Sequence, residues 1–434
     1  MAAPGSHTLS HVWPIHSTLG AGGELLLGGC DASELAARFG TPAYVVSEQD
    51  LRDTAREFKS AFEQHAGDNY EVHFASKAFP ATAVLRVMAE EGLACDVATG
   101  GELALALGAG FDPARIHLHG NAKSDRELRE ALEAGVGDIV IDNLDELEAL
   151  IALVPAGSRQ RILLRVAPGV SPDTHPKIST GGPNTKFGFN PSDARIAVER
   201  CRQSDRVELD GLHMHIGSQI FDLEPFHAAV EVLVALGEFR TLNLGGGLGV
   251  PYLHEQSSPS VSDYVARKVQ LVRDLAGPDV RIADEPGRAL VARSTVTLYT
   301  VQTVKHNVAK WVAVDGGMSD NLRPMMYEAR YEAMVCGRPY DPAHPGPHDD
   351  TVEVCHLAGK HCESGDVLIH DVALPAPARG DVIAVPVTGA YGHAMANTYN
   401  AQPRPPIVFV SGGQAREVVR RESYADLSAR DING

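Results

Sequence analysis

A lysine at the end of a predicted strand is the first residue whose position suggests chemistry. The segment EVHFASKAF (71–79) contains an apolar run from Val72 to Ala75, and Lys77 follows that run directly. Lysine is normally a solvated surface residue. At the mouth of a buried strand its amine would be desolvated, which lowers the pKa and leaves the amine able to form a Schiff base with a carbonyl compound. We therefore treat Lys77 as a candidate catalytic residue.

A run of three glycines predicts a phosphate site. The segment LNLGGGLG (242–249) is typical of a strand that leads into Gly245, Gly246 and Gly247. Glycine lets backbone N–H groups approach a ligand closely, and a nest of such groups binds phosphate. A tight turn is the alternative, but a turn needs only one glycine. The next strand ends in EPGR, whose arginine would add a guanidinium to the same phosphate.

The glutamate of the EPGR segment (285–288) has two interpretations. Glu285 would lie deeper than Arg288, where a carboxylate keeps a pyridine nitrogen protonated and makes the ring a strong electron sink. The structural alternative is a buried ion pair between Glu285 and Arg288.

Two histidines in GLHMHIGSQ (211–219) also have two interpretations. His213 and His215 form an HxH pair, and some barrel hydrolases hold zinc with such a pair, a lysine and an acid. In those enzymes the pair belongs to the first strand and the lysine comes later, whereas the order here is reversed. An imidazole of His215 stacked on a cofactor ring, with Ser218 bonded to the cofactor, fits better. A core histidine without a chemical role is the remaining alternative.

The spacing of strand-like and helix-like segments predicts a (β/α)8 barrel of the TIM type. Apolar strands alternate with amphipathic helices, and such strands indicate a parallel sheet covered on both faces. The predicted strands are 71–76, 93–97, 115–118, 138–141, 161–166, 207–214, 240–244 and 280–284. An open doubly wound sheet is the alternative, but the first strand is not followed by GxGxxG. In a barrel the catalytic groups lie at the C-terminal strand ends, where the following all fall: Lys77, Asp96, Asn121, Asp142, Arg165, His213, His215, the glycines 245–247, Glu285 and Arg288.

The C-terminal third predicts a separate antiparallel β-domain. Its strand-like segments are 294–304, 310–317, 351–359, 381–391 and 406–413. We expect a flexible N-terminus (1–20), a lead-in (21–45) whose short strand Leu25–Leu27 joins the β-domain, the barrel (46–294) and the β-domain (295–434). The segment GRPYDPAHPGPHDD (337–350) is predicted to be a surface loop.

Composition excludes several classes of function. The formal net charge of the 434 residues is −18, which opposes binding to a phosphate backbone or an anionic membrane surface. No stretch approaches the roughly 20 apolar residues of a membrane span. The N-terminus lacks the features of a signal peptide. Six cysteines without CxxC spacing indicate reduced thiols. We therefore expect a cytoplasmic enzyme with no metal and no nucleic-acid partner.

The order Lys77, HIGSQ, GGGLG and EPGR resembles that of the fold-type III PLP-dependent decarboxylases, which include the ornithine, arginine and diaminopimelate enzymes. The segments DGGMSDNLRPMMY (315–327), HCESGD (361–366) and GAY (389–391) are similar to the diaminopimelate branch. The resemblance covers roughly residues 30 to 425. It implies an alanine racemase-like architecture, pyridoxal 5′-phosphate as cofactor, and a homodimer with active sites at the interface.

The resemblance implies roles for individual residues. Lys77 matches the lysine that holds the cofactor, and Glu102 a residue behind it. The cofactor-binding residues implied are Lys77, Asp96, His215, Ser218, Gly245, Gly246, Gly247, Glu285, Pro286, Gly287, Arg288 and Tyr391. The substrate-binding residues implied are Arg288, Arg323, Tyr327, Glu363 and Tyr391. Cys362 matches the cysteine that protonates the product across the dimer interface; a buried core thiol is the alternative for Cys362.

The reaction implied is decarboxylation of meso-2,6-diaminopimelate to L-lysine and CO2, the last step of lysine synthesis, by a carboxy-lyase. The distal ammonium and carboxylate of this substrate need charged partners, which Glu363 and Arg323 would supply. Ordinary surface positions are the alternative for Arg323 and Tyr327. A decarboxylase for another amino acid, a racemase and a non-catalytic PLP-binding protein remain alternatives. Gly392 and His393 stand where the family pattern predicts other residues, which concerns fine specificity.

Overall fold

The structure is a computed structural model that describes residues 9–20, 22–170, 180–182, 185–338 and 352–432. The chain divides into two compact units. We call residues 52–249 and 258–290 the barrel unit, and residues 1–51, 250–257 and 291–434 the β-unit. Nearly all of the predicted loop 337–350 lies outside the described residues.

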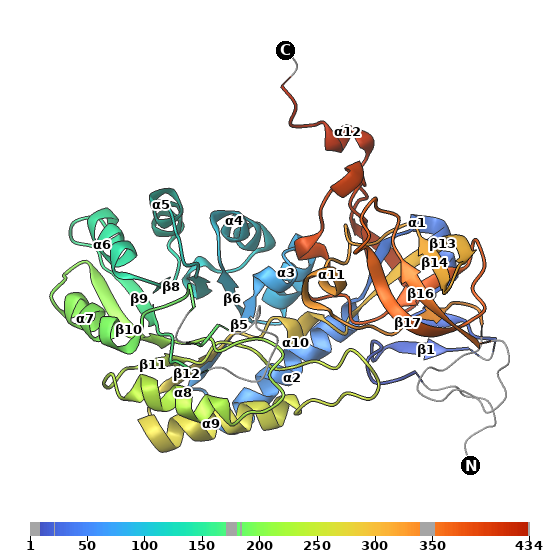
Figure 1. The fold of residues 1–434 in the computed structure, drawn as a ribbon. Coiled ribbons are helices and arrows are strands. Elements are labelled where there is room, and N and C mark those ends of the chain that lie inside the picture. The colour runs from blue at the N-terminus through green and yellow to red at the C-terminus, as the bar shows by residue number, and fades with distance from the viewer. Residues whose placement is uncertain (1–8, 21, 171–179, 183–184, 339–351, 433–434) are drawn as a thin grey trace. The chain divides into compact units, whose positions relative to one another are not determined.

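The barrel unit is a closed parallel barrel of eight strands, as predicted (Figure 1). Its strands are β5 (Tyr70–Ala75), β6 (Ala94–Val97), β7 (Ile116–Leu118), β8 (Asp138–Ile141), β9 (Gln160–Arg165), β10 (Val207–His213), β11 (Thr241–Asn243) and β12 (Arg281–Asp284). The last strand pairs with the first, since Ile282 lies opposite Tyr70. The open doubly wound sheet is therefore excluded.

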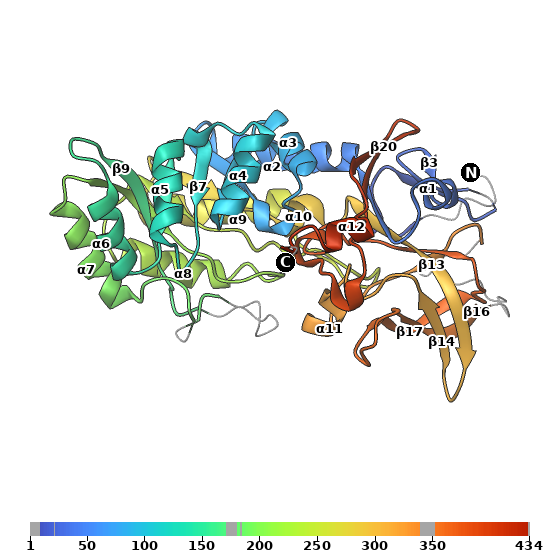
Figure 2. The ribbon, with the colours of Figure 1, turned by 90° about the horizontal axis from the view of Figure 1, so that it is seen from above.

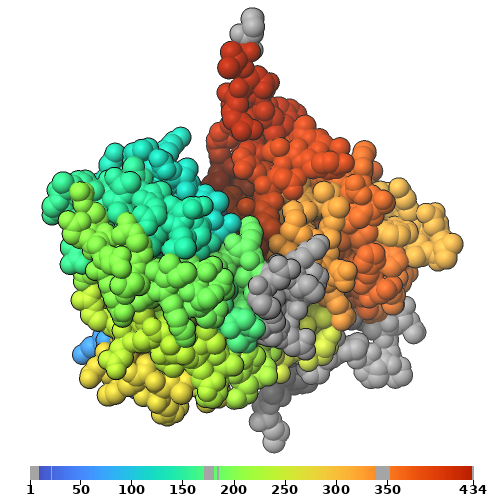
Figure 3. Space-filling view, turned by 60° about the vertical axis from the view of Figure 1, so that its left-hand side comes forward, coloured from blue at the N-terminus to red at the C-terminus, as the bar shows by residue number. Residues whose placement is uncertain are grey.

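Helices cover the outside of the barrel, and several begin and end at signals that the sequence supplies. They are α2 (Glu48–Ala66), α3 (Thr82–Glu90), α4 (Gly100–Ala109), α5 (Asp125–Ala134), α6 (Leu144–Leu153), α7 (Pro191–Arg202), α8 (Pro225–Val234) and α9 (Val261–Ala276). Helix α5 shows the signals best: Ser124 and Glu127 form a capping box, and Gly135 ends the helix in the left-handed conformation. In the space-filling view, α5 to α7 in teal and green form one side of the barrel unit (Figure 3).

The β-unit contains a nine-stranded sheet that is mixed rather than antiparallel. Its strands are β4 (Ala43–Ser47), β13 (Thr295–His306), β14 (Lys310–Val314), β15 (Met334–Val335), β16 (Val352–Ala358), β17 (Val367–Pro375), β18 (Val382–Val385), β19 (Ile407–Ser411) and β20 (Gln414–Val419). Strands β13, β14, β16 and β17 lie side by side (Figure 2). Most pairs are antiparallel as predicted, but β14–β16 and β4–β19 are parallel. Two parallel neighbours cannot be joined by a hairpin and need a long connection, and the strands of both parallel pairs are far apart in the sequence.

The strand that the N-terminal region adds to this sheet is not the one that we predicted. Leu25–Leu27 forms a strand, β2, but it pairs with β1 (Ser17–Leu19) and β3 (Cys30–Asp31) in a small separate sheet. Strand β4 joins the large sheet instead, between β13 and β19. Each of its residues is buried, which explains why this apolar segment occupies the sheet interior.

Part of the predicted flexible N-terminus is packed. Residues 1–8 lie outside the described residues, but Val12 and Trp13 are buried and β1 pairs with β2. The expectation of a mobile segment up to residue 20 is thus wrong for the part that includes Val12, Trp13 and β1. A buried tryptophan removes a large apolar area from water, which stabilises the segment.

The barrel interior is unusually polar. Barrel cores are commonly filled by branched apolar residues. Here the buried side chains on or next to the strands include His73, His117, His119, Asp138, His213, Asn243 and Glu285. This polar interior leads directly to the site described below. In the described part of the chain, no helix is long and apolar enough to cross a membrane.

Candidate active site

Lys77 lies in a short 3-10 turn, η1 (Ser76–Ala78), that follows β5. Its Nζ is 3.1 Å from the Oδ2 atom of Asp96, a residue of the neighbouring strand β6. Glu102 of α4 fastens the turn, because its carboxylate accepts hydrogen bonds from the Ser76 hydroxyl and the Ala98 N–H. The lysine side chain is 43% exposed, so it is less desolvated than the sequence predicted. Lys77 is thus held by a carboxylate and remains accessible.

Glu285, directly after β12, is surrounded by hydrogen-bond donors. Its Oε1 accepts from His119 (2.8 Å) and from the amide of Asn243 (2.6 Å), and its Oε2 lies 3.1 Å from His213 Nε2. His117 is 4.0 Å away. Although burial raises the pKa of Glu285, the histidines outweigh burial and hold that pKa well below its usual range. Glu285 is therefore a buried carboxylate that stays ionised.

The histidines around Glu285 differ in their protonation. Burial lowers the pKa of His213 to about 4, so this ring is neutral at pH 7. His215 also has a pKa well below its usual value, because of burial and the nearby charges of Lys77 and Arg165. The pKa of His117 rises to about 9: burial opposes the charge, but the carboxylates of Asp138, 3.2 Å away, and Glu285, 4.0 Å away, favour it. One fixed imidazolium and neutral rings therefore stand around one carboxylate.

A cavity of about 450 Å³ in the barrel unit connects these groups. Its lining includes Lys77, Asn121, Arg165, Lys186, His213, His215 and Glu285. Asp142 lies at the end of β8, where its carboxylate accepts a hydrogen bond from the Gly188 N–H, 3.0 Å away. The tertiary structure thus brings six of the strand-end residues predicted from the sequence to one cavity.

The three glycines after β11 leave backbone donors unsatisfied. Within the described part of the chain, the N–H groups of Gly246, Gly247 and Leu248 have no acceptor, although Gly246 and Leu248 are buried. Buried N–H groups without an acceptor are rare in folded proteins. A Cβ atom on Gly246 would lie 2.2 Å from the Glu285 carbonyl oxygen, so only glycine fits. We call Gly245 to Leu248 the glycine cradle.

Arg288 and Ser218 lie in the same barrel unit and contact one another. The guanidinium of Arg288 donates from Nε (3.2 Å) and Nη2 (3.1 Å) to the Ser218 hydroxyl. The segment before Arg288 packs against the lysine turn: the Pro286 carbonyl accepts from Ala75 N–H, and Gly287 lies against Ala75 and Ala78. Pro286 and Gly287 therefore hold the EPGR segment, and with it Arg288, against the turn that carries Lys77.

These residues fit pyridoxal 5′-phosphate. The glycine cradle offers backbone donors to an anion, Arg288 adds a cation, and Lys77 offers an amine for an aldehyde. One lone pair of Glu285 Oε2 remains for a ring N–H, because the described contacts bring only His213 to that oxygen.

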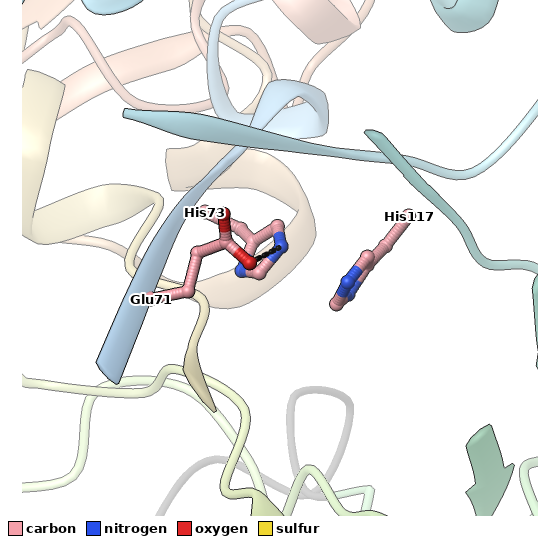
Figure 4. A group of neighbouring side chains, drawn as sticks. All are labelled: Glu71, His73 and His117. Atoms are coloured by element: carbon pink, nitrogen blue, oxygen red, sulfur yellow. Dashed lines mark ion pairs between the residues drawn. The ribbon is translucent and has the colours of Figure 1, made fainter. Parts of the chain in front are cut away.

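Two groups of side chains in the barrel interior have ligand atoms close enough for a metal ion: Glu71, His73 and His117, and His117, His119 and Glu285. Figure 4 shows the first group, with Glu71 and His73 on β5 and His117 on β7. The imidazoles of His73 and His117 stack with centroids 3.7 Å apart and planes tilted by 34°. Nitrogen lone pairs lie in the ring planes, so stacked rings do not point them at one ion.

The carboxylate of Glu71 also has other partners. It pairs with Arg281 (2.7 Å) and Arg115 (3.1 Å), so two cations already neutralise it. Neither His213 nor His215, the HxH pair of the zinc interpretation, belongs to the two metal-like groups found among the described residues.

Residues 48–292 match the family described as pyridoxal-dependent decarboxylase, pyridoxal binding domain. The chain belongs to the pyridoxal-dependent decarboxylase family. The match also identifies the cofactor as pyridoxal 5′-phosphate, as predicted. The chain is 44% identical to diaminopimelate decarboxylase of Bacillus subtilis, covering 94% of this chain and 95% of that protein. It is 41% identical to the Mycobacterium tuberculosis enzyme, covering 98% and 99%.

Solved structures of the decarboxylase family have the same fold. Diaminopimelate decarboxylase of M. jannaschii in complex with L-lysine has a TM-score of 0.89 at 34% identity, over 97% of this chain and 98% of that chain. The alanine racemase-like architecture predicted from the sequence is thus confirmed. Lysine/ornithine decarboxylase of Vibrio vulnificus, with a TM-score of 0.74 at 24% identity over 87% of this chain and 97% of that chain, shares the fold.

The β-unit holds the remaining predicted site residues. For Arg323, the alternative was an ordinary surface position. Arg323 opens helix α11 (Arg323–Tyr327) and is buried, so it is not an ordinary surface residue. Its guanidinium lies over the Tyr252 ring at 4.3 Å and donates to the Tyr331 hydroxyl at 2.5 Å. Its Nε has no hydrogen-bond partner among the described residues.

The other β-unit residues lie at or near the surface of that unit. Cys362 and Glu363 are exposed, which excludes a buried core thiol for Cys362. Tyr327 is half-buried, and so is Tyr391, which has a positive φ of 62°. His393 contacts Tyr44 edge to face, and burial lowers its pKa to about 4.

Several residues of the site escaped the sequence interpretation. His117 and His119 lie in HLHG, on β7 and directly after it, an HxH pair with the same spacing as His213 and His215. Alternate strand residues share a face, so this spacing could have placed both rings inside the barrel. Asn243 closely precedes the glycines, and only its contact with Glu285 reveals its role.

Proposed function

We propose that this protein decarboxylates meso-2,6-diaminopimelate to L-lysine and CO2. The single observation that carries the proposal is that the ionised Glu285 and the accessible amine of Lys77 line the same cavity. The substrate follows from similarity over nearly the whole chain to proteins named diaminopimelate decarboxylase. It also accords with the L-lysine bound in the M. jannaschii structure.

Each end of the cofactor would have its own set of residues. Lys77 would hold the cofactor covalently, and Asp96 would fix the lysine before binding. The N–H groups of the glycine cradle, with Arg288 and Ser218, would hold the phosphate. His215 would contribute a neutral flat ring, because its pKa lies well below 6.5.

The cofactor supplies a ring that accepts the electron pair left when CO2 departs. Glu285 controls how well the ring does so, because an ionised carboxylate keeps a proton on the pyridine nitrogen. Its three donors, His119, His213 and Asn243, hold the carboxylate in one orientation. A preorganised charge of this kind costs no rearrangement at the moment of reaction.

A proton must then return to the carbon atom that lost CO2. Lys77 is one donor within the barrel unit, and we propose Cys362 as the second. Cys362 is exposed in the β-unit, as a group that serves an active site in a partner subunit must be. We propose a homodimer on the same grounds. The six free cysteines fit our proposal of a cytoplasmic location.

Arg323 and Glu363 are proposed to bind the distal end of the substrate. An arginine can hold the distal carboxylate in a bidentate manner and a glutamate can accept from the distal ammonium. The unpartnered Nε of Arg323 leaves a donor for this carboxylate. Tyr327 and Tyr391 would complete this binding region.

The first experiment is to incubate the purified protein with meso-diaminopimelate, with and without added pyridoxal 5′-phosphate, and to follow lysine and CO2. We expect equal amounts of the two products, formed only with the cofactor. A protein that binds the cofactor but forms no lysine would instead be a decarboxylase for another amino acid, and L-ornithine and L-arginine would be tested next.

A further inference from the structure

A buried lysine behind the glycine cradle has no role in the chemistry described so far. Lys268 lies on α9 and its side chain is fully buried. Its Nζ donates to the carbonyl oxygens of Gly245 (2.9 Å) and Leu244 (3.3 Å). It also pairs with the carboxylate of Asp284, which ends β12. The cation thus connects the cradle to the strand that leads to Glu285.

The surroundings of Lys268 compensate for burying a charge. The hydroxyl of Tyr264 lies 2.5 Å from Nζ, and the ammonium lies over the rings of Tyr264 (4.3 Å) and Phe226 (4.4 Å). Burial lowers the pKa of Lys268, an effect that Asp284 opposes. A buried cation is costly unless it is paired and hydrogen-bonded, and here nearly every donor direction is occupied.

The contacts of Lys268 control where the cradle N–H groups point. In a trans peptide the carbonyl and the following N–H point in opposite directions within one plane. A carbonyl of Gly245 held by Lys268 therefore turns the N–H of Gly246 away from α9. The same carbonyl also accepts from the Glu285 N–H at 3.2 Å, which fixes it from a second side. The Gly246 N–H is one of the three in the cradle that have no acceptor in the described structure, with those of Gly247 and Leu248.

We propose that Lys268, paired with Asp284, is a positioning residue for the cofactor phosphate. It holds the carbonyl of Gly245 so that the next N–H, that of Gly246, points toward the anion. The proposal deepens the cofactor role and rests on it, but not on the identity of the amino-acid substrate. It predicts that loss of the ammonium weakens recognition of the phosphate and spares recognition of the rest of the cofactor.

The test compares the cofactor with pyridoxal, which lacks the phosphate. The apo-protein and its Lys268→Met variant are titrated with pyridoxal 5′-phosphate and with pyridoxal, and the dissociation constants are read from absorbance. Hydrogen bonds to a charged group contribute about 1.5–3 kcal/mol, which corresponds to roughly 10- to 100-fold in affinity. We expect a loss of this size for pyridoxal 5′-phosphate and less than about threefold for pyridoxal.

Lys123 provides a matched control. It is also buried, donates to two carbonyls (Gly120, 2.8 Å; Val140, 2.7 Å) and pairs with Glu146. Lys123→Met should lower the unfolding temperature as Lys268→Met does, yet leave the affinity ratio of the two ligands unchanged. If Lys268→Met does not fold, Asp284→Asn keeps the shape and should reduce the same ratio by a smaller factor.

Two outcomes would overturn the proposal. Equal weakening of both ligands by Lys268→Met would make the pair a stabilising core contact only. A wild-type protein that binds both ligands equally well would refute the phosphate cradle itself. A different result would separate the two proposals. If the wild-type protein forms no lysine, but Lys268→Met loses affinity selectively for pyridoxal 5′-phosphate, the substrate assignment is refuted and the positioning role is supported.

Discussion

Around Glu285 the polar groups are side chains that gain or lose protons, whereas at the glycine cradle they are backbone N–H groups with fixed dipoles. Glu285 and its histidines belong to the first kind. Gly246 and Gly247 belong to the second, with Lys268 behind them. In the proposed site, the reacting ring needs a charge tuned by its neighbours, whereas the phosphate is a permanent anion and needs donors that are fixed in place.

The largest effect is expected at the accessible amine. Lys77→Ala removes the covalent hold on the cofactor and a proton donor, and positioned proton transfer alone contributes about 10²–10⁴-fold. Turnover of diaminopimelate should fall by more than roughly a thousandfold. Lysine formation is the measurement, and substantial remaining activity would contradict the assignment. The proposed phosphate site is unchanged in this variant, so it should still bind the cofactor noncovalently.

A change at Glu285 should affect the reaction much more than the binding of the cofactor. Glu285→Gln keeps the size of the side chain but removes the charge that favours a protonated ring nitrogen. Removing one preorganised electrostatic group typically costs about 10²–10³-fold in kcat. We expect a fall of this order in kcat at saturating cofactor, with a much smaller change in cofactor affinity.

Ser218→Ala is the control for Glu285→Gln, because Ser218 contacts Arg288 at the phosphate end. It should weaken cofactor binding and leave kcat at saturating cofactor within about threefold, since one hydrogen bond contributes roughly 1 kcal/mol. If both variants changed kcat alike, the division between a ring end and a phosphate end would be wrong.

Arg323 should behave like neither Glu285 nor the residues of the proposed phosphate site. Arg323→Ala removes the proposed partner of the distal carboxylate, and a charged hydrogen bond contributes about 1.5–3 kcal/mol. We expect KM for diaminopimelate to rise roughly 10- to 100-fold while the dissociation constant of pyridoxal 5′-phosphate stays nearly constant. Equal effects on the two ligands would argue against a substrate role.

The smallest effect concerns stability and its dependence on pH. The folded protein raises the pKa of His117 from 6.5 to about 9, so it binds a proton that the unfolded chain releases. The resulting stabilisation is fully present below pH 6.5 and is lost as pH rises through 9. It amounts to roughly 3 kcal/mol. Urea unfolding of the apo-protein between pH 6 and 10 should show this decline.

Asp138→Asn tests the cause of the pH dependence. Asp138 lies 3.2 Å from His117 and also pairs with Arg161, and Glu285 and His73 face the same imidazole. Without the Asp138 charge, the pKa of His117 should fall and the decline in stability above pH 6.5 should flatten. An unchanged slope would mean that another group takes up the proton.

Much of the fold was predictable because local patterns and tertiary contacts agree. All eight barrel strands lie within a residue or two of their predicted positions, since apolar runs between amphipathic helices have few other arrangements. The prediction failed at the N-terminus, where both Leu25–Leu27 and β4 are apolar. The partners of β4 lie far away in the sequence, and hydrophobicity does not specify a partner.

By itself the sequence determined the barrel, the lysine at its first strand end, the glycine run and the EPGR segment, because each depends on residue type and local spacing. Only the tertiary structure decided the charges. His117 and His213 are both buried histidines on strands, yet the pKa of one rises to about 9 and that of the other falls to about 4. The difference arises because Asp138 contacts His117, and the distance between two charges is a property of the folded chain.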